Sequence, residues 1–173
     1  MNFKIETEYN IKTLTVMAKA LRKTVRKKRN LRSRIIGIIV LILALLLILP
    51  LGGKVFTFDF RTIITIIAAL VLLLTLIFED KLNGYVAKKR MLPGLDKSIV
   101  TFYEDNYFSE TPLGKSEFNY ENVKYFAENS DYFVFIFSEI HAQIYSKNGL
   151  TGGSTAEFRS YIKNITGKEF INF

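Results

Sequence analysis

The densest chemical feature of this 173-residue sequence is a run of nine lysines and arginines between Lys19 and Arg34. Guanidinium and ammonium groups at this density bind phosphate, either on nucleic acid or on anionic lipid headgroups. The run leads directly into an apolar stretch, so lipid is the favoured ligand and nucleic acid the lesser alternative. A purely topological role, in which the charges orient the apolar stretch and solvate a helix, stays open. The residues expected to contact the membrane surface are Arg22, Lys23, Arg26, Lys27, Lys28, Arg29, Arg32 and Arg34.

The other chemically capable residues do not form a catalytic or metal-binding set. His141 is the single histidine, and we expect it on the polar side of a strand with no nucleophile or orienting partner nearby. The segment GLTGGS (149–154) lacks the lysine of a phosphate loop, so its glycines predict a turn and Ser154 a helix N-cap. Cysteine is absent, and the acidic residues fall mostly in turns without metal-ligand spacing. We therefore expect no catalytic residue, no cofactor and no metal ion.

The net charge of +8 is divided unevenly along the chain. Residues 1–34 carry eleven bases and two acids, whereas residues 96–173 carry seven bases and eleven acids. A nucleic-acid-binding domain normally carries positive charge on its folded part, and here the part expected to fold is acidic. The same acidity argues against phosphoinositide capture in a basic pocket. Within this segment Lys147 is the candidate contact for a protein partner.

Two uncharged apolar runs, residues 35–51 and 62–78, are expected to be transmembrane helices. Seventeen helical residues cover about 26 Å, which approaches the ~30 Å hydrocarbon core of a bilayer. Two buried helices of a soluble core are the alternative, but helices apolar on every face fit poorly in a protein this small. Lysine and arginine are concentrated before the first run and after the second. This bias predicts a multi-pass protein of the cell membrane with both termini in the cytoplasm.

The flanking segments are expected to form a small folded domain. Residues 2–9 alternate as a short strand does, and residues 10–25 repeat apolar side chains at helical spacing. The second pattern indicates a basic amphipathic helix that runs on into the first span. After a connector over residues 79–95, about six short strands are expected between residues 98 and 146. The capping box STAE (154–157) then opens a C-terminal helix that ends near Gly167.

The expected fold class is membrane α+β, with a two-helix transmembrane hairpin and a small β domain. That domain is a small antiparallel β-sheet or partial barrel capped by a C-terminal helix, which is pleckstrin-homology-like (PH-like) in outline. We further hypothesise that residues 2–9 join this sheet as a seventh strand, which makes the hairpin an insertion. The expected segments are 1–34 for the strand and basic helix, 35–78 for the hairpin, 79–95 for the connector and 96–173 for a cytoplasmic β domain.

The segment IHAQIYSKNGLTGGSTAEFRSYI (140–162) resembles part of the YcxB-like family of bacterial membrane proteins. The similarity lies in a closing strand, a lysine, a glycine-containing loop and a helix that opens around Glu-Phe. Residues 111–137 are similar to the hairpin and aromatic central strand that precede it. The family often has a proline before that lysine, whereas Ser146 precedes Lys147 here. The resemblance implies a basic N-terminal helix, two apolar spans and a small C-terminal domain, and it implies no activity.

Together these features predict a membrane-anchored protein-binding or regulatory module. Its expected partners are anionic lipid headgroups of the bilayer and an unidentified protein, the latter bound by strand addition at an open sheet edge. A regulatory form of this prediction is self-docking, in which the acidic C-terminal domain rests on the basic helix through charge. Two alternatives remain, a homo-oligomeric membrane protein that protects against membrane-active agents and a membrane enzyme, of which the enzyme is the less favoured.

Overall fold

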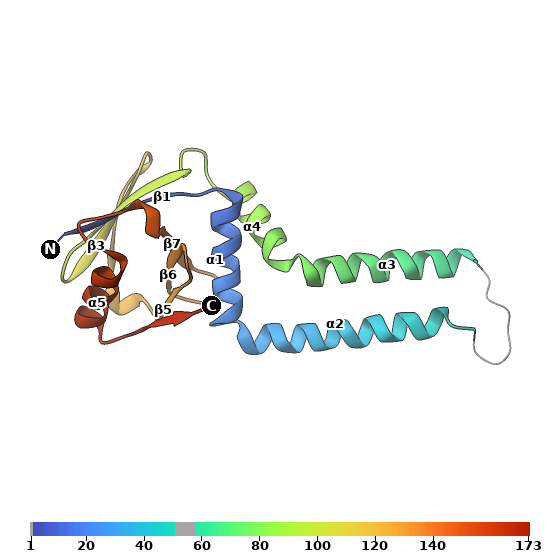
Figure 1. Ribbon diagram of the computed structural model, residues 1–173. Coiled ribbons are helices and arrows are strands. Elements are labelled where there is room, and N and C mark those ends of the chain that lie inside the picture. The colour runs from blue at the N-terminus through green and yellow to red at the C-terminus, as the bar shows by residue number, and fades with distance from the viewer. Residues whose placement is uncertain (1, 51–57) are drawn as a thin grey trace.

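The computed structural model describes residues 2–50 and 58–173 of the chain. A β domain lies at one end of the molecule and a long two-helix hairpin at the other, with a pair of short helices between them (Figure 1). The loop between the two spans is predicted to lie on the outer side of the membrane, with Phe56, Phe58 and Phe60 at the interface. Residues 51–57, which include Lys54 and Phe56, lie outside the described residues.

The first sheet is built around the N-terminal strand. Strand β1 pairs antiparallel with β2 over its full length, and it pairs with β8 on its other side. Its side chains alternate strictly, so that Phe3, Ile5 and Thr7 are buried. The hypothesis that residues 2–9 join the sheet is therefore confirmed. In the order β4-β3-β2-β1-β8, the strands are β4 (Gly114–Asn119), β3 (Asn106–Thr111), β2 (Lys97–Phe102), β1 (Phe3–Glu8) and β8 (Leu150–Thr151).

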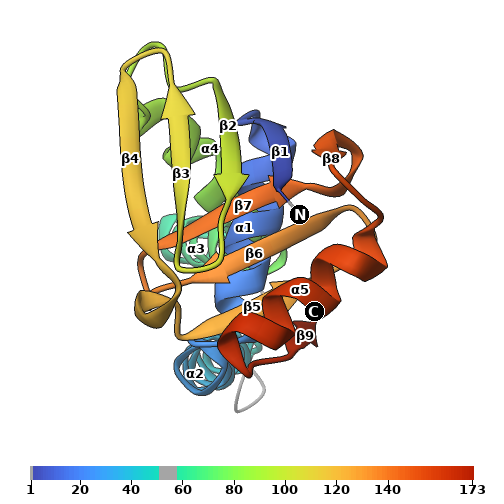
Figure 2. The ribbon, with the colours of Figure 1, turned by 90° about the vertical axis from the view of Figure 1, so that its left-hand side faces the viewer.

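The second sheet has the order β7-β6-β5-β9 and includes one parallel pair. Its strands are β7 (Ala142–Ser146), β6 (Tyr132–Ile136), β5 (Tyr125–Glu128) and β9 (Phe170–Asn172). A short 3-10 turn at Tyr120–Asn122 redirects the chain between β4 and β5, and this turn separates the two sheets (Figure 2). The expected antiparallel pairing is confirmed for most of these strands, but the described strands form two open sheets and β9 runs parallel to β5.

Aromatic side chains from both sheets and from helix α5 (Thr155–Thr166) fill the core of the β domain. The Phe158 ring lies 5.3 Å from that of Phe3 and 4.9 Å from those of Phe102 and Phe133. Because these rings come from β1, β2, β6 and α5, the N-terminal strand and the C-terminal helix share one core. The packing of α5 over the sheets is visible in Figure 2.

Helix α5 has the ends predicted from the sequence. Ser154 Oγ accepts a hydrogen bond from the Glu157 backbone nitrogen at 3.2 Å, and the Glu157 carboxylate accepts one from the Ser154 nitrogen at 2.7 Å. The helix stops at Gly167, whose φ of +67° is in the left-handed region that glycine adopts without steric cost. The predicted capping box and the predicted helix end are both confirmed.

Helix α1 (Ile11–Lys23) covers the outer face of the second sheet, and α4 (Glu79–Arg90) packs against α1 (Figure 1). Ala20 and Leu21 of α1 are buried against apolar side chains of β5, β6 and β7. The expectation of one continuous helix into the first span is wrong. Because its apolar face is committed to the sheet, α1 ends at Lys23, where Thr24 Oγ1 donates to the Ala20 oxygen, and a new helix begins at Lys27.

The hairpin consists of α2 (Lys27–Ile48) and α3 (Phe60–Ile77), which run side by side away from the β domain (Figure 1). Both helices have a mean hydropathy of 2.5 over their most apolar window, and both are long enough to cross a membrane. Within those windows 6% of the residues of α2 and none of those of α3 are buried. Helices in the core of a soluble protein are mostly buried, so this exposure disfavours the soluble alternative.

Candidate functional site

The basic residues that are predicted to contact the membrane surface lie where α1 ends and α2 begins. Two of them pair with acidic residues of α4. Arg22 donates two hydrogen bonds to Asp80, from Nε to Oδ1 at 2.7 Å and from Nη2 to Oδ2 at 2.6 Å. The two side chains are only 16% and 18% exposed, and such two-pronged pairs are among the stronger polar contacts in proteins. Arg34 forms a longer ion pair with Glu79, at 3.6 Å. These contacts fasten α1 and the first half of α2 to the first turn of α4.

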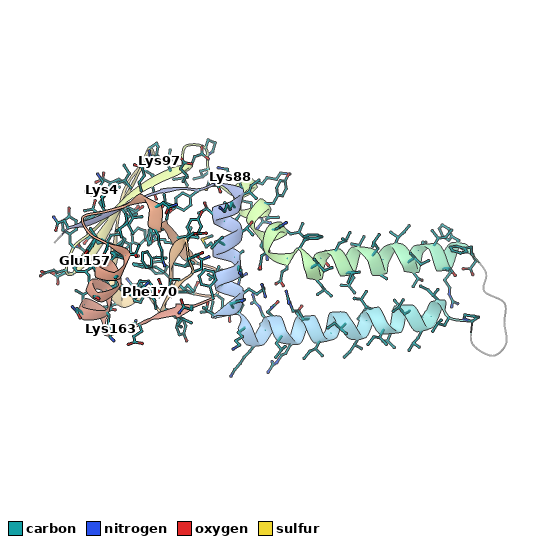
Figure 3. The ribbon with its side chains drawn as sticks, viewed as in Figure 1. Lys4, Lys88, Lys97, Glu157, Lys163 and Phe170 are labelled. Atoms are coloured by element: carbon teal, nitrogen blue, oxygen red, sulfur yellow. The ribbon has the colours of Figure 1, made fainter. Side chains whose placement is uncertain are left out.

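Asp80 also affects the chemistry of Arg22. Its hydrogen bond raises the pKa of the Arg22 guanidinium, although burial alone acts in the opposite direction. Arg22 therefore stays charged although its side chain is mostly shielded from solvent. Lys88 holds the other end of α4, since its Nζ donates to the Tyr9 backbone oxygen at 2.9 Å and also pairs with Asp96 (Figure 3).

Arg26 and Arg29 face the β domain. Arg26 Nε donates to the backbone oxygen of Glu139 at 2.5 Å, and Arg29 Nη1 donates to the Glu139 carboxylate at 2.7 Å. The side chains of the second pair are both more than half exposed, so that pair contributes little stability. The main contact between α1 and the β domain is the apolar one around Ala20 and Leu21. The contact between α1 and the second sheet is thus mainly apolar, and release of the domain by a change in charge stays a prediction.

Lys23 and Lys27 are exposed and line an open hollow of about 600 Å³ beside the start of α2. Neither ammonium group has a hydrogen bond or an ion pair among residues 2–50 and 58–173. Lys28 and Arg32 are also exposed but do not belong to this lining. We call this feature the basic hollow. It is lined by Arg22, Lys23, Lys27, Asn30, Leu31, Arg34, Asn172 and Phe173.

A second open groove lies on the other leg of the hairpin, where α3 bends into α4 beside the first residue of α1. Its volume is about 610 Å³, and its lining is almost wholly apolar. Phe78, Leu82 and Tyr85 contribute exposed side chains to it. We call this feature the apolar groove. It is lined by Ile11, Val71, Leu74, Thr75, Phe78, Lys81, Leu82 and Tyr85.

Lys147, the predicted partner contact, lies within a charged cluster of the β domain. Its side chain is 11% exposed, and its Nζ donates to Glu128 Oε2 and to the Asn129 backbone oxygen, each at 2.6 Å. Arg159 of α5 donates to both oxygens of the same carboxylate, at 2.7 and 2.9 Å. Lys147 is thus already occupied by intramolecular contacts. The sequence places these three residues far apart, so only the fold brings them together.

The Glu128 cluster forms one wall of an open pocket of about 650 Å³. Lys163 and Phe170, which are labelled in Figure 3, lie on its rim in the β domain. Burial alone would raise the pKa of Glu128, but the hydrogen bonds from Arg159 and Lys147 outweigh it and lower the pKa below its ordinary value. The carboxylate is therefore ionised near neutral pH. This state suits a partner in an ion pair, whereas a general acid must carry a proton at that pH.

The other candidate residues for chemistry, His141 and the GLTGGS segment, lie in loops, turns and the short strand β8 of the β domain. His141 is exposed in the loop that precedes β7, with its ring 5.4 Å from that of Phe137. In the GLTGGS segment, a Cβ on Gly149 would overlap the Glu6 backbone oxygen, and Gly152 has a φ of +92°. Glycine at these positions lets β8 approach β1 closely. Among the residues that the structure describes, no group of three or more His, Asp and Glu side chains is placed to hold a metal ion.

Comparison with known proteins supports one assignment. Residues 102–162, from the end of β2 to the last turn of α5, match the protein family described as "YcxB-like protein". This match confirms the family resemblance drawn from the sequence, and it covers the part of the β domain that contains Lys147 and Arg159. No curated protein and no solved structure shows significant similarity to the chain.

Proposed function

We propose that the protein is an integral membrane module that holds its β domain in a fixed orientation at the cytoplasmic surface, where the domain binds a protein partner. The observation that supports this proposal is that the hairpin is inserted in the chain between β1 and β2, two adjacent strands of the first sheet. β1 leads through α1 into α2, and α3 returns through α4 into β2, the hydrogen-bonded neighbour of β1. A domain held by two legs in this way cannot rotate freely as one on a single flexible linker does.

The exposure of the hairpin supports its insertion in the bilayer. Large apolar side chains cover α2 and α3 on their outer faces, among them Leu47 at 63% and Ile77 at 62% exposed. Exposed apolar surface of this extent is unfavourable in water and favourable in lipid. The lysines and arginines lie mainly at the β-domain end of the hairpin, and by the positive-inside rule this bias supports the proposed cytoplasmic position of that domain and of both termini.

Topology is tested by cysteine labelling, because the natural chain contains no cysteine. A Lys54→Cys variant in the connecting loop should react with an impermeant maleimide on intact cells. A Lys168→Cys variant in the β domain should react only after permeabilisation. Reversal of the two results would overturn the orientation, and labelling of neither site on intact cells would overturn the outer position of the loop.

The proposed surface for a protein partner is the free edge of β4. This six-residue strand ends the first sheet, and all of its residues except Phe118 are exposed (Figure 2). The edge strands β8 and β9 have two and three residues. The edge of β7 faces β1, since the Ser146 nitrogen donates to Thr7 Oγ1 at 3.0 Å. An open row of backbone donors and acceptors on β4 suits addition of an extended peptide.

In-cell photocrosslinking tests this surface. A photoreactive residue in place of Ser116, in the middle of β4, should capture a discrete partner band. The same residue in place of Glu169, which is exposed elsewhere in the domain, should not capture it. Equal capture at both positions, or capture only of the protein's own second copy at position 116, would contradict the partner-binding proposal. The second result would favour the homo-oligomeric alternative.

A further inference from the structure

We propose that the basic hollow is a binding site for one anionic phospholipid, with the lipid phosphodiester between Lys23 and Lys27 and an acyl chain along Leu31 and Ile35. This inference rests on the proposed insertion of the hairpin in the membrane. It goes further in naming a single site and its ligand, where the basic run as a whole predicts only a diffuse attraction to the surface.

Charge within the hollow favours one phosphate. The positive charges of Arg22 and Arg34 are balanced by Asp80 and Glu79 of α4. Lys23, the last residue of α1, and Lys27, the first residue of α2, have no such side-chain partner among the described residues. The hollow therefore keeps two uncompensated ammonium groups where the two helices meet. Two ammonium groups suit the single negative charge of a phosphodiester together with further hydrogen bonding to its oxygens or to a glycerol headgroup. The Asn30 side chain in the same lining adds an uncharged polar group.

The position of the hollow matches the depth of a headgroup. Arg34 is the last charged residue before the uncharged run that starts at Ile35, so the charged lining ends where the hydrocarbon region begins. Leu31, on the same helix, is 60% exposed within the lining, and Ile35 is 50% exposed one turn further along. A ligand that is charged at one end and apolar at the other satisfies both parts of this surface, whereas a free anion leaves the apolar part exposed to water.

The hollow also joins the membrane end of the molecule to the β domain. Asn172, the last residue of β9, and Phe173 line it together with residues of α1 and α2. The Phe173 nitrogen donates to the Glu128 backbone oxygen at 3.2 Å, which ties this wall to β5. A lipid in the hollow therefore contacts the β domain and the start of the first span together, and it should stabilise their relative orientation.

The test uses the full-length protein in maltoside micelles titrated with phosphatidylglycerol. Bound lipid is counted by native mass spectrometry, and the thermal unfolding midpoint is followed by near-ultraviolet circular dichroism. The wild-type protein should retain one phosphatidylglycerol and unfold at a higher temperature with it. Replacing both lysines, as in K23Q/K27Q, should weaken binding about 30-fold, since each basic residue near an anionic headgroup contributes about fivefold.

Matched control variants distinguish a specific lipid site in the basic hollow from a general electrostatic attraction to anionic lipid. The K89Q/R90Q variant removes the same charge from two exposed positions in the last turn of α4, outside the hollow, and it should bind nearly as the wild type does. The K23R/K27R variant should retain most of the affinity, which shows that loss in K23Q/K27Q reflects charge and not misfolding. Equal weakening of K23Q/K27Q and K89Q/R90Q would overturn the proposal in favour of diffuse surface attraction.

The source of the phosphate is tested in the same titration. Phosphatidylcholine should not replace phosphatidylglycerol, and equal binding of the two lipids would show that the charge of the headgroup is irrelevant. Inorganic phosphate should stabilise the protein far less than the lipid, and equal stabilisation would assign the hollow to a free anion. Failure of lipid binding with the cysteine-labelling pattern intact would overturn this inference and leave the membrane topology standing.

Discussion

At the scale of single residues, Glu128 is the most constrained charge in the β domain. Its side chain is 7% exposed and receives hydrogen bonds from Lys147 and from both arms of Arg159. The Lys147 ammonium also lies 4.6 Å from the centre of the Phe133 ring, so it is held against the aromatic core. Removal of the carboxylate from this cluster leaves the mostly buried Lys147 ammonium without its counter-charge.

We expect a Glu128→Gln substitution to lower the free energy of unfolding by about 3 kcal/mol, the typical cost of breaking a mostly buried ion pair from one side. The measurement is thermal unfolding in micelles, followed by the near-ultraviolet circular dichroism of the buried tyrosines. A Glu169→Gln substitution is the control, because it removes the same charge from an exposed pair with Lys163 and should change stability little. Similar effects of the two substitutions would show that burial of the Glu128 cluster is unimportant.

Stability should also depend on pH through this carboxylate. Its pKa in the folded protein lies below the ordinary value, so its contribution is complete above the unfolded pKa of about 4.3 and is lost as the pH falls through the folded pKa. Other carboxylates also titrate there, so the informative quantity is the difference in unfolding midpoint between the wild type and Glu128→Gln. That difference should be constant from about pH 8 to pH 5 and shrink at lower pH. A difference that grows on acidification would contradict the assigned direction of the pKa shift.

At the scale of elements, the α1–α4 pair transmits the position of the hairpin to the β domain. The two helices meet at Gly84, which is buried against Thr15. A Cβ at Gly84 would lie 2.7 Å from the Thr15 nitrogen and 2.8 Å from its Cα, and both of these atoms belong to the backbone. The close approach therefore depends on the absence of a side chain at this one position.

We expect Gly84→Ala to destabilise the protein by about 2 kcal/mol, because the helices must separate to admit the methyl group. This net loss would occur although alanine favours a helix interior by about 1 kcal/mol relative to glycine. Asn83→Ala, at the neighbouring exposed position, is the control and should be neutral or slightly stabilising. The readout is the thermal unfolding midpoint of each variant. A Gly84→Ala protein at least as stable as the Asn83→Ala protein would show that the helices do not pack through this glycine.

The elements that the sequence predicted well are those whose own side chains carry a regular pattern. Strand β1 alternates buried and exposed residues along its whole length, and α5 has both an N-terminal capping box and a C-terminal glycine in its sequence. By contrast, α4 has no apolar stripe, because its main contacts are made through Gly84 and through the long side chain of Lys88. The sequence therefore predicts a connector over residues 79–95, where the structure has this helix. Strand β9 has only three residues and is defined by its pairing with β5, which no local pattern reveals.

The same reasoning applies to the candidate site. The basic run was visible because its residues adjoin one another in the sequence. The division into paired and unpaired charges was not visible, since Asp80 lies 58 residues after its partner Arg22. The sequence predicts Lys147 as an available contact because it does not reveal the pairing with Glu128, which lies 19 residues earlier on β5. Pairings between distant segments follow from the fold and have no local signature.

At the scale of the whole molecule, the hairpin is an insertion in a β domain whose first strand precedes it. β1 lies between β2 and β8, and it supplies Phe3 and Ile5 to the core. α1 covers the outer face of the second sheet. Residues 96–173 therefore lack one interior strand and one covering helix of their own domain. The predicted β domain, residues 96–173, is incomplete in this respect.

We therefore expect residues 96–173, expressed alone, to remain unfolded or to aggregate, since the exposed edge of β2 and the uncovered second sheet are both apolar. A chain that joins residues 2–25 to residues 79–173 by a short glycine-serine linker should fold, because Arg22 and Asp80 already lie in contact at the cut ends. Near-ultraviolet circular dichroism and cooperative thermal unfolding distinguish the two outcomes. Within the joined chain, Ile5→Asp should abolish folding, because it places a charge at a fully buried position of β1. Cooperative unfolding of residues 96–173 alone would show that β1 and α1 are additions to a self-sufficient domain, and the rigid two-legged attachment would lose its main support.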